Sequence, residues 1–205
     1  MPTPVTISAD EFRSLFFSAS LMHEPTDAPA GPRSLATLIR RLGFVQLDTI
    51  SVVERAHHHI LWTRRHDYQP ATLDRLQRSG QLFEHFTHDA SLIPADWFPH
   101  WRHRFGRVQW SKWFGQRLGT RKNDLLDLVR ARIRAEGPLL ARDFDDPNHQ
   151  RGEWWEWKPA KAALEYLWRT GELSIPRRDG FEKVYDLTER VLPRQHALET
   201  PDEAS

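Results

Sequence analysis

Residues 171–193 read GELSIPRRDGFEKVYDLTERVLP, and the pattern of this stretch is the clearest indication of the fold. Two β-prone runs, Leu173 to Arg177 and Phe181 to Leu187, flank Asp179-Gly180, a pair that supplies the positive φ of a tight turn. The stretch therefore predicts a β-hairpin. A helix with an apolar face is expected directly before it, from about Pro159 to Thr170. A hairpin that follows helices is typical of the wing of a winged helix.

Two further helical segments are expected upstream of this hairpin. Asn123 is a good cap for a helix that Gly137 and Pro138 end. Its inward face is expected to comprise Leu125, Leu128, Val129 and Ile133. Residues 139–144 fit a short second helix. This half therefore has the order helix, helix, helix, hairpin.

The first half of the chain shows the same order. Helices are expected over residues 9–20, 34–43, 51–65 and 70–80. Ser8 with Glu11 forms a capping box for the first helix, and Ser34 caps the second. Ser51 with Glu54 forms a box for the third, and a β-hairpin is expected over residues 81–93. The fold class predicted from this repeat is mainly α (α+β), with tandem winged-helix domains and short β-wings.

The predicted domain boundaries follow from the repeat. Residues 1–93 form a first winged-helix unit, 94–122 a basic Trp-rich connecting segment, 123–193 a second unit, and 194–205 a tail. Trp97, Trp101, Trp110 and Trp113 alternate with basic residues in the connecting segment. They suit stacking on nucleic acid and packing between domains equally well. Trp154, Trp155 and Trp157 are expected in a core or an interface.

Composition excludes several classes of protein. The 205 residues carry a net charge of only +1, which is unlike a dense polycation, so a nucleic-acid surface must be local. No cysteine is present, which excludes a disulfide framework, a thiolate metal site and a thiol nucleophile. No apolar run is long enough to span a membrane and no signal peptide is recognisable, so a cytoplasmic location is expected.

Gln46-Leu47-Asp48 is the triplet that suggests chemistry. On an extended backbone an amide and a carboxylate two residues apart project from one face and can hold a water between them. An ionised carboxylate also stabilises the positive charge that develops on a sugar when a glycosidic bond breaks. Taken alone, the triplet fits better an exposed strand end in which Asp48 caps a turn, because Gln-x-Asp is a common triplet and its spacing does not make it catalytic.

The run from Leu42 to Arg65, LGFVQLDTISVVERAHHHILWTRR, resembles the winged-helix DNA glycosylases of the AlkZ and YcaQ type. Phe83 to Pro94, FEHFTHDASLIP, resembles the first wing of that family, and Gly171 to Pro193 resembles its second. The resemblance implies hydrolysis of the N-glycosidic bond of N7-alkylated purines or of interstrand crosslinks. It implies double-stranded DNA as the partner, no cofactor and no metal, and a place at the bacterial nucleoid.

The family carries its catalytic residues in a Gln-aliphatic-Gln or Gln-aliphatic-Asp motif. By this resemblance Gln46 positions a water, and Asp48 activates the water and stabilises the cationic sugar. N7 alkylation already makes the purine a good leaving group, so a carboxylate in a water-poor channel should provide most of the acceleration. Because a bulky crosslink cannot be flipped wholly into a tight pocket, we expect an open cleft against the minor groove.

The chain departs from the family at its C-terminus. The resemblance implies a longer protein that also has a third winged helix and a β-barrel, whereas this sequence ends at Ser205. Thr200 and Glu203 resemble the opening of another helix. Three explanations stay open: a truncated protein, a split gene whose partner supplies the C-terminal domains, or a naturally short homologue.

Several basic and histidine side chains are expected to face DNA. They are Arg55, His58, Arg64, Arg65, His88, Arg107, Lys112, Arg177 and Arg178. For the three consecutive histidines of residues 57–59, metal binding is disfavoured because helical side chains fan out about 100° apart, and plain solvated surface is the alternative. His88 could instead make a structural hydrogen bond. Arg177 and Arg178 flank a turn and could simply be exposed.

Three hypotheses for function are therefore carried forward. The first is a monofunctional DNA glycosylase that uses Gln46 and Asp48. The second is a non-catalytic winged-helix DNA-binding protein or regulator. The third is a protein-interaction module, because a fold does not by itself fix a function.

Overall fold

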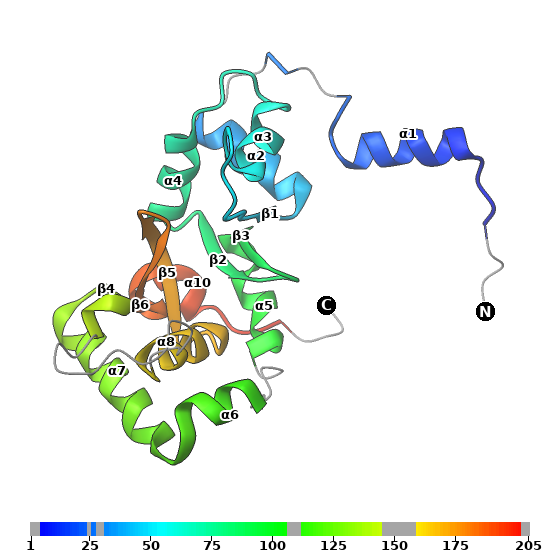
Figure 1. The fold of residues 1–205 in the computed structure, drawn as a ribbon. Helices are drawn as coiled ribbons and strands as arrows, with labels where there is room; N and C mark the ends of the chain where they lie inside the picture. The colour runs from blue at the N-terminus through cyan, green and yellow to red at the C-terminus, as the bar shows by residue number, and fades with distance from the viewer. Residues whose placement is uncertain (1–4, 24–25, 28–30, 106–111, 145–158, 202–205) are drawn as a thin grey trace.

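The protein consists of helices packed around two small antiparallel sheets (Figure 1). The computed structural model describes residues 5–23, 26–27, 31–105, 112–144 and 159–201. The strands of the first sheet are, in spatial order, β1 (Val45–Gln46), β3 (Ala90–Pro94) and β2 (Leu82–Phe86). Those of the second are β4 (Leu139–Leu140), β6 (Glu182–Leu187) and β5 (Leu173–Asp179). The expected mixture of helix and strand, dominated by helix, is confirmed.

The described α-helices are α1 (Ala9–Ala19), α2 (Pro32–Leu42), α3 (Ala56–Trp62), α4 (Pro70–Arg78), α5 (Phe98–Phe105), α6 (Lys112–Leu118), α7 (Lys122–Glu136), α8 (Pro159–Arg169), α9 (Thr188–Val191) and α10 (Pro193–Ala197). Three short 3-10 helices are η1 (Ala95–Trp97), η2 (Gly119–Arg121) and η3 (Ala141–Phe144). Within the described part of the chain, no helix is long and apolar enough to cross a membrane.

Helix α2 supplies the main apolar face of the first half. Its N-cap is Gly31 and its first residue is Pro32, so the predicted cap at Ser34 is wrong. Proline suits this position because its φ is already helical and its missing N–H would have had no partner there. Gly43, with φ +92°, ends the helix as predicted. The buried face consists of Leu35, Leu38 and Ile39.

Helix α3 begins later than its predicted capping box. Arg55 is the N-cap, and the backbone N–H of Arg55 donates to Glu54 Oε1 at 2.8 Å. The Glu54 carboxylate is thus used locally, and no reciprocal bond to Ser51 forms. Val52 and Val53, which lie within the predicted helix, are instead outside α3 and are 91% and 88% exposed. Residues 51–55 therefore form a protruding loop.

The first hairpin agrees with its prediction. Strands β2 and β3 pair from Leu82 opposite Pro94 to Phe86 opposite Ala90, with residues 87–89 as the connection. The expected helix over residues 70–80 is confirmed by α4. Strand β1 adds to the outer edge of β3, with Gln46 opposite Ser91.

The segment expected only to connect the two units contains ordered helices. Trp101 on α5 packs against the ring of His85, and its Nε1 donates to His85 Nδ1 at 3.0 Å. The guanidinium of Arg104 stacks over the Trp101 ring at 4.4 Å. Of the two roles left open for these tryptophans, Trp101 has the packing role. Trp110 and the side chain of Trp113 lie outside the described residues.

The second half of the chain differs from its predicted structure in three respects. Helix α7 begins at Lys122, so Asn123 is not its cap. Leu126, Val129 and Ile133 form its buried face, which places Leu128 on the opposite side, 53% exposed. Residues 139–144 form β4 and a 3-10 turn rather than a helix. Helix α8 is confirmed, whereas Trp154, Trp155 and Trp157 lie outside the described residues.

The second hairpin forms as predicted, but its turn is shifted by one residue. Asp179 pairs with Glu182, so the two turn residues are Gly180 and Phe181, with φ of +55° and +71°. A bulky residue at positive φ is uncommon, so the surrounding contacts must hold Phe181 in place. The pairing of β5 also shifts register around Pro176, which cannot donate to a ladder.

A buried polar junction joins the two sheets. Glu84 on β2 has a fully buried side chain and binds Arg178 on β5 through two hydrogen bonds of 2.7 and 2.9 Å. Trp168 Nε1 donates to the Glu84 carbonyl oxygen at 2.9 Å. Gln77 Nε2 donates to the Ile175 carbonyl oxygen at 3.0 Å. The first hairpin and the second therefore share one network of satisfied polar groups.

The two ends of the chain behave differently. The predicted capping box of α1 is confirmed by bonds between Ser8 and Glu11 in both directions, of 2.7 and 3.2 Å. This helix lies apart from the rest of the molecule and has no buried residue (Figure 1). At the other end, the Arg102 guanidinium donates to the backbone carbonyls of Gln195 and His196, which ties α10 to α5. Glu203, expected to open a further helix, lies outside the described residues.

The Glu84–Arg178 pair gives a stability prediction. Arg178→Ala leaves a buried carboxylate without its partner and should lower the free energy of unfolding by about 3–5 kcal/mol, measured by urea denaturation. Arg142→Ala is the matched control, since its pair with Glu182 is more than half exposed on both sides. That change should cost about 0–1 kcal/mol. Equal costs for the two variants would contradict a junction held by Glu84.

Candidate functional site

The edge strand β1 positions the Gln46 and Asp48 side chains. Val45 and Leu47 are buried, whereas Gln46 is exposed and Asp48 half-buried, so the chain alternates as a half-buried strand should. The backbone N–H of Leu47 donates to the Ala90 carbonyl oxygen at 2.8 Å, which continues the pairing with β3. The amide and the carboxylate therefore project from one face at the edge of the first sheet.

His88, in the turn between β2 and β3, reaches back to Gln46. Its Nε2 lies 2.9 Å from Gln46 Oε1. Because an amide oxygen can only accept, Nε2 carries the proton in this bond. The ring of Phe44 meets the His88 ring edge-on, with centroids 6.0 Å apart. The bond fixes the Gln46 amide with its oxygen toward His88, and the amide nitrogen has no hydrogen-bond partner among the described residues.

Asp48 is held by both its side chain and its backbone. Its Oδ1 accepts from the backbone N–H of Ile50 at 2.8 Å, and its own N–H donates to His57 Nδ1 at 3.1 Å. The first contact makes a turn of the type that Asp commonly forms two residues along the chain. Within the described residues, Oδ2 makes no hydrogen bond. One carboxylate oxygen is thus anchored and the other is left for a ligand.

His57 stays uncharged beside this carboxylate. Burial lowers the pKa of His57 from 6.5 to about 4, and the neighbouring His58 and Arg55 act in the same direction. Its Nδ1 accepts the Asp48 N–H, which requires the unprotonated form of that nitrogen. An imidazolium here would cancel part of the negative field of Asp48. The neutral ring instead fixes the backbone of Asp48 and leaves the negative charge of the carboxylate without a compensating cation on this side.

The sequence did not single out His57 for this position. The sequence predicts a DNA-facing or solvated surface for the three consecutive histidines together, with metal binding disfavoured. A local signal existed, because His57 lies four residues before the buried Leu61 and therefore on the inward face of α3. Its partner could not be predicted, because the contact with Asp48 crosses the whole loop between β1 and α3.

The side chains expected to face DNA fall into two groups. His58 is half-buried, 2.7 Å from the Tyr68 hydroxyl, and Arg64 donates to the Ser20 carbonyl oxygen. Arg65 is buried, with 8% of its surface exposed. These three side chains are therefore wholly or partly buried within the first half of the chain. Among the predicted side chains that the structure describes, His88 alone is both exposed and in contact with the Gln-Leu-Asp motif.

The remaining predicted arginines gather at the second hairpin. Arg178 is bound to Glu84, and Arg177 pairs with Asp179 at 3.0 Å. Arg55, from the first half, stacks its guanidinium over the Phe181 ring at 4.1 Å. Each of these three guanidinium groups thus has a contact within the protein, and their contact with phosphate stays a prediction. Arg107 and the side chain of Lys112 lie outside the described residues.

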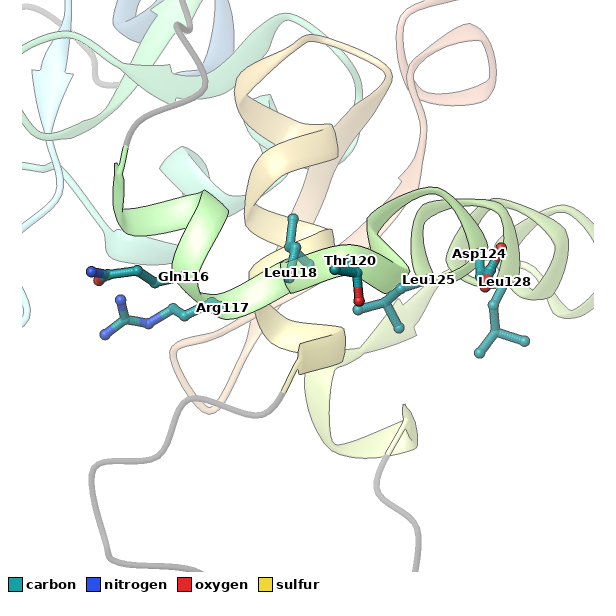
Figure 2. Close-up of a pocket in the computed structure, with 8 residues that line it drawn as sticks. Gln116, Arg117, Leu118, Thr120, Asp124, Leu125 and Leu128 are labelled. Carbon is teal, nitrogen blue, oxygen red and sulfur yellow. The ribbon is translucent and has the colours of Figure 1, made fainter.

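Two cavities lie elsewhere in the described structure. One of about 380 Å³ lies between α6 and α7 and is lined by Gln116, Leu118 and Leu125 among others (Figure 2). The other, of about 430 Å³, lies between α2, η1, α10 and residues 79–82, and it is lined by the ion pair between Arg40 and Asp96. Neither includes Gln46 or Asp48. Gln46 is exposed on the edge strand β1, so the candidate site is an open edge, which suits a large ligand better than a small enclosed molecule.

The described residues contain no group of three or more His, Asp or Glu side chains that could hold a metal ion. His85, on β2, is buried among the rings of Trp101, Phe105 and Trp168. It accepts from Trp101 and lies 3.2 Å from the Trp168 carbonyl oxygen. Its two ring nitrogens are thus both used for structure.

Comparison with known proteins identifies one family. The sequence model of a family described as DNA glycosylase AlkZ-like matches residues 39–205, which is most of the chain. The matched region includes the edge strand, the loop after it, both hairpins and the buried junction. No solved structure matches the chain.

The environment of His57 gives a testable pH prediction. In the folded protein the ring should titrate near pH 4, whereas in urea it should titrate near 6.5. The folded state then binds fewer protons between these values, so the free energy of unfolding should fall as the pH drops from about 6.5 to about 4. NMR titration of the histidine ring signals measures the pKa of His57 directly. Its signal is assigned from its loss in His57→Gln. A folded-state midpoint near 6.5 would contradict a buried, neutral His57.

Proposed function

The chain belongs to the AlkZ-like DNA glycosylase family, and on this basis we propose that it hydrolyses the N-glycosidic bond of N7-alkylated purines or of interstrand crosslinks in double-stranded DNA. Asp48 and Gln46 are the catalytic residues in this proposal. The observation that carries it is the Asp48 carboxylate at an open sheet edge, anchored through Oδ1 and backed by a neutral histidine.

The reaction suits these groups. Alkylation at N7 gives the purine a positive charge, so the base leaves with the bonding electrons without first being protonated. Positive charge then develops on the sugar, and the Asp48 carboxylate stabilises it. Water attacks the anomeric carbon, and Asp48 accepts its proton. No metal is needed for any of these steps.

Gln46 orients the water in this proposal, and His88 orients Gln46. Support comes from the 2.9 Å bond that fixes the amide oxygen and leaves the amide nitrogen available as a donor. A fixed donor holds a water in one place more effectively than a freely rotating amide, because the entropy of ordering is already lost. His88 is therefore a positioning residue that acts through Gln46.

The proposal extends to the fold and the partner. Each half combines helices with a three-stranded antiparallel sheet that ends in a hairpin, an arrangement compatible with tandem winged helices that lie on duplex DNA. The proposed units are residues 1–93 and 123–193, joined by residues 94–122. The exposed position of Gln46 and His88 is compatible with a lesion that stays within a groove.

Removing the Asp48 charge tests the catalytic assignment. Asp48→Asn retains the oxygen that accepts from Ile50 and should slow single-turnover release of 7-methylguanine by a hundredfold or more, on the order expected for a transition-state charge. Asp10→Asn, on the exposed helix α1, is the matched control and should leave the rate unchanged. Full activity of Asp48→Asn would refute the assignment. Duplex binding by the wild type without any base release would favour the non-catalytic DNA-binding hypothesis.

The positioning role of His88 has a separate test. His88→Ala frees the Gln46 amide and should lower the single-turnover rate at saturating enzyme by roughly ten- to a hundredfold, because a misplaced water reacts more slowly. The Kd for duplex DNA should change little. His196→Ala, on α10, serves as the control. A change in Kd alone, with the rate unaffected, would show that His88 contacts DNA rather than positioning Gln46.

A further inference from the structure

The loop that follows Asp48 carries three large apolar side chains in solvent. Ile50 is 70% exposed, Val52 is 91% exposed and Val53 is 88% exposed. An isolated exposed apolar residue is ordinary, but a run of three such residues beside a candidate site calls for a ligand. Two of the three are consecutive valines, whose branched side chains have few rotamers and lose little entropy when they bind.

This loop is held at both ends. At its start, the Ile50 N–H donates to Asp48 Oδ1, so the loop and the candidate catalytic carboxylate share one turn. At its end, Ser51 and Arg55 form an isolated antiparallel bridge. The Arg55 guanidinium stacks on Phe181, and the Arg178 guanidinium lies 4.5 Å from the same ring. The second hairpin therefore braces the base of the loop while its tip stays exposed.

The Glu54 carboxylate does not project from the tip. It accepts the N–H of Arg55 and lies against the backbone at the base of the loop. The two residues before Glu54 are therefore exposed and apolar, and the Glu54 carboxylate already has a partner in the Arg55 N–H. A preorganised apolar tip can enter a narrow space without first losing conformational freedom.

We propose that Val52 and Val53, with Ile50 beside them, form an apolar wedge that enters the base stack of duplex DNA next to the lesion. This inference rests on the proposed glycosylase function. Its chemical ligand is the stacked face of nucleobases, which apolar side chains can contact without unpaired polar groups.

Distance favours this ligand over a protein partner. If Asp48 reaches the anomeric carbon of the lesion, Val52 follows it by four residues and lies at most about 14 Å away, from an extended length of about 3.3–3.6 Å per residue. Neighbouring bases in a strand are about 3.4 Å apart, so the tip reaches no further than about four base steps from the lesion. An apolar tip in that position is therefore within reach of the stacked bases.

A wedge also suits a lesion that cannot be extruded. A base in an interstrand crosslink is tethered to the opposite strand, so complete flipping into a pocket is blocked. Opening one base step instead exposes the glycosidic bond to a carboxylate at the same edge. The wedge and Asp48 are then rigidly linked through the turn at Ile50.

Unstacking can be measured with 2-aminopurine placed beside a 7-methylguanine in a duplex. In the Asp48→Asn background the lesion should persist, and binding should raise the 2-aminopurine fluorescence severalfold. Adding Val52→Ser and Val53→Ser should abolish this rise. Adding Val52→Ile and Val53→Ile should retain it. Adding Leu128→Ser, at a half-exposed residue of α7, should also retain it.

The same substitutions in the active protein provide a second readout. Val52→Ser with Val53→Ser should slow single-turnover base release at least tenfold, and the isoleucine pair should not. Fluorescence that rises equally with the serine pair would overturn the wedge, even if base release by the wild type supports the glycosylase. Conversely, valine-dependent unstacking by a protein that releases no base would support the wedge and refute the proposed catalysis.

Discussion

The buried ion pair between Glu84 and Arg178 joins the two sheets and so constrains how the two halves of the structure pack. Glu84 is fully buried, and its carboxylate accepts two guanidinium bonds while its carbonyl accepts from Trp168. Removing either partner would leave a charge in the interior without compensation, which is far costlier than losing an exposed pair. Because the pair spans the two sheets, it fixes the second hairpin against the first. The turn of that hairpin, at Phe181, is thereby placed against Arg55.

The candidate site depends on this bracing although it lies in the first half. Its own groups come from three places: the edge strand with Gln46, the hairpin turn with His88, and helix α3 with His57. Asp48 connects them, because its backbone is bound to α3 and its side chain starts the protruding loop. A carboxylate held in this way needs little reorganisation when charge develops on a ligand, which is how electrostatic stabilisation becomes effective.

The elements that the sequence predicted well depend on residues a few positions apart. The capping box of α1, the Gly43 end of α2, helices α4 and α8 and both hairpins follow from local spacing. The predictions that were wrong concern competition between local signals. Ser51 and Glu54 had the spacing of a capping box, but Glu54 bonds to its neighbour Arg55 instead. Leu128 was expected to face inward, but the spacing of the packed residues leaves it outside.

The sequence by itself determined that Gln46 and Asp48 share a face, because side chains alternate along any extended strand. It also determined where the two hairpins lie, because turn residues act locally. Only the tertiary structure decided what surrounds the motif. His88 lies 42 residues from Gln46, and Arg178 lies 94 residues from Glu84. Such contacts depend on how whole elements pack, and neither periodicity nor capping specifies them. The same packing leaves Val52 and Val53 in solvent, buries Arg65 and binds Arg178 to Glu84, although both arginines were predicted from the sequence to face DNA.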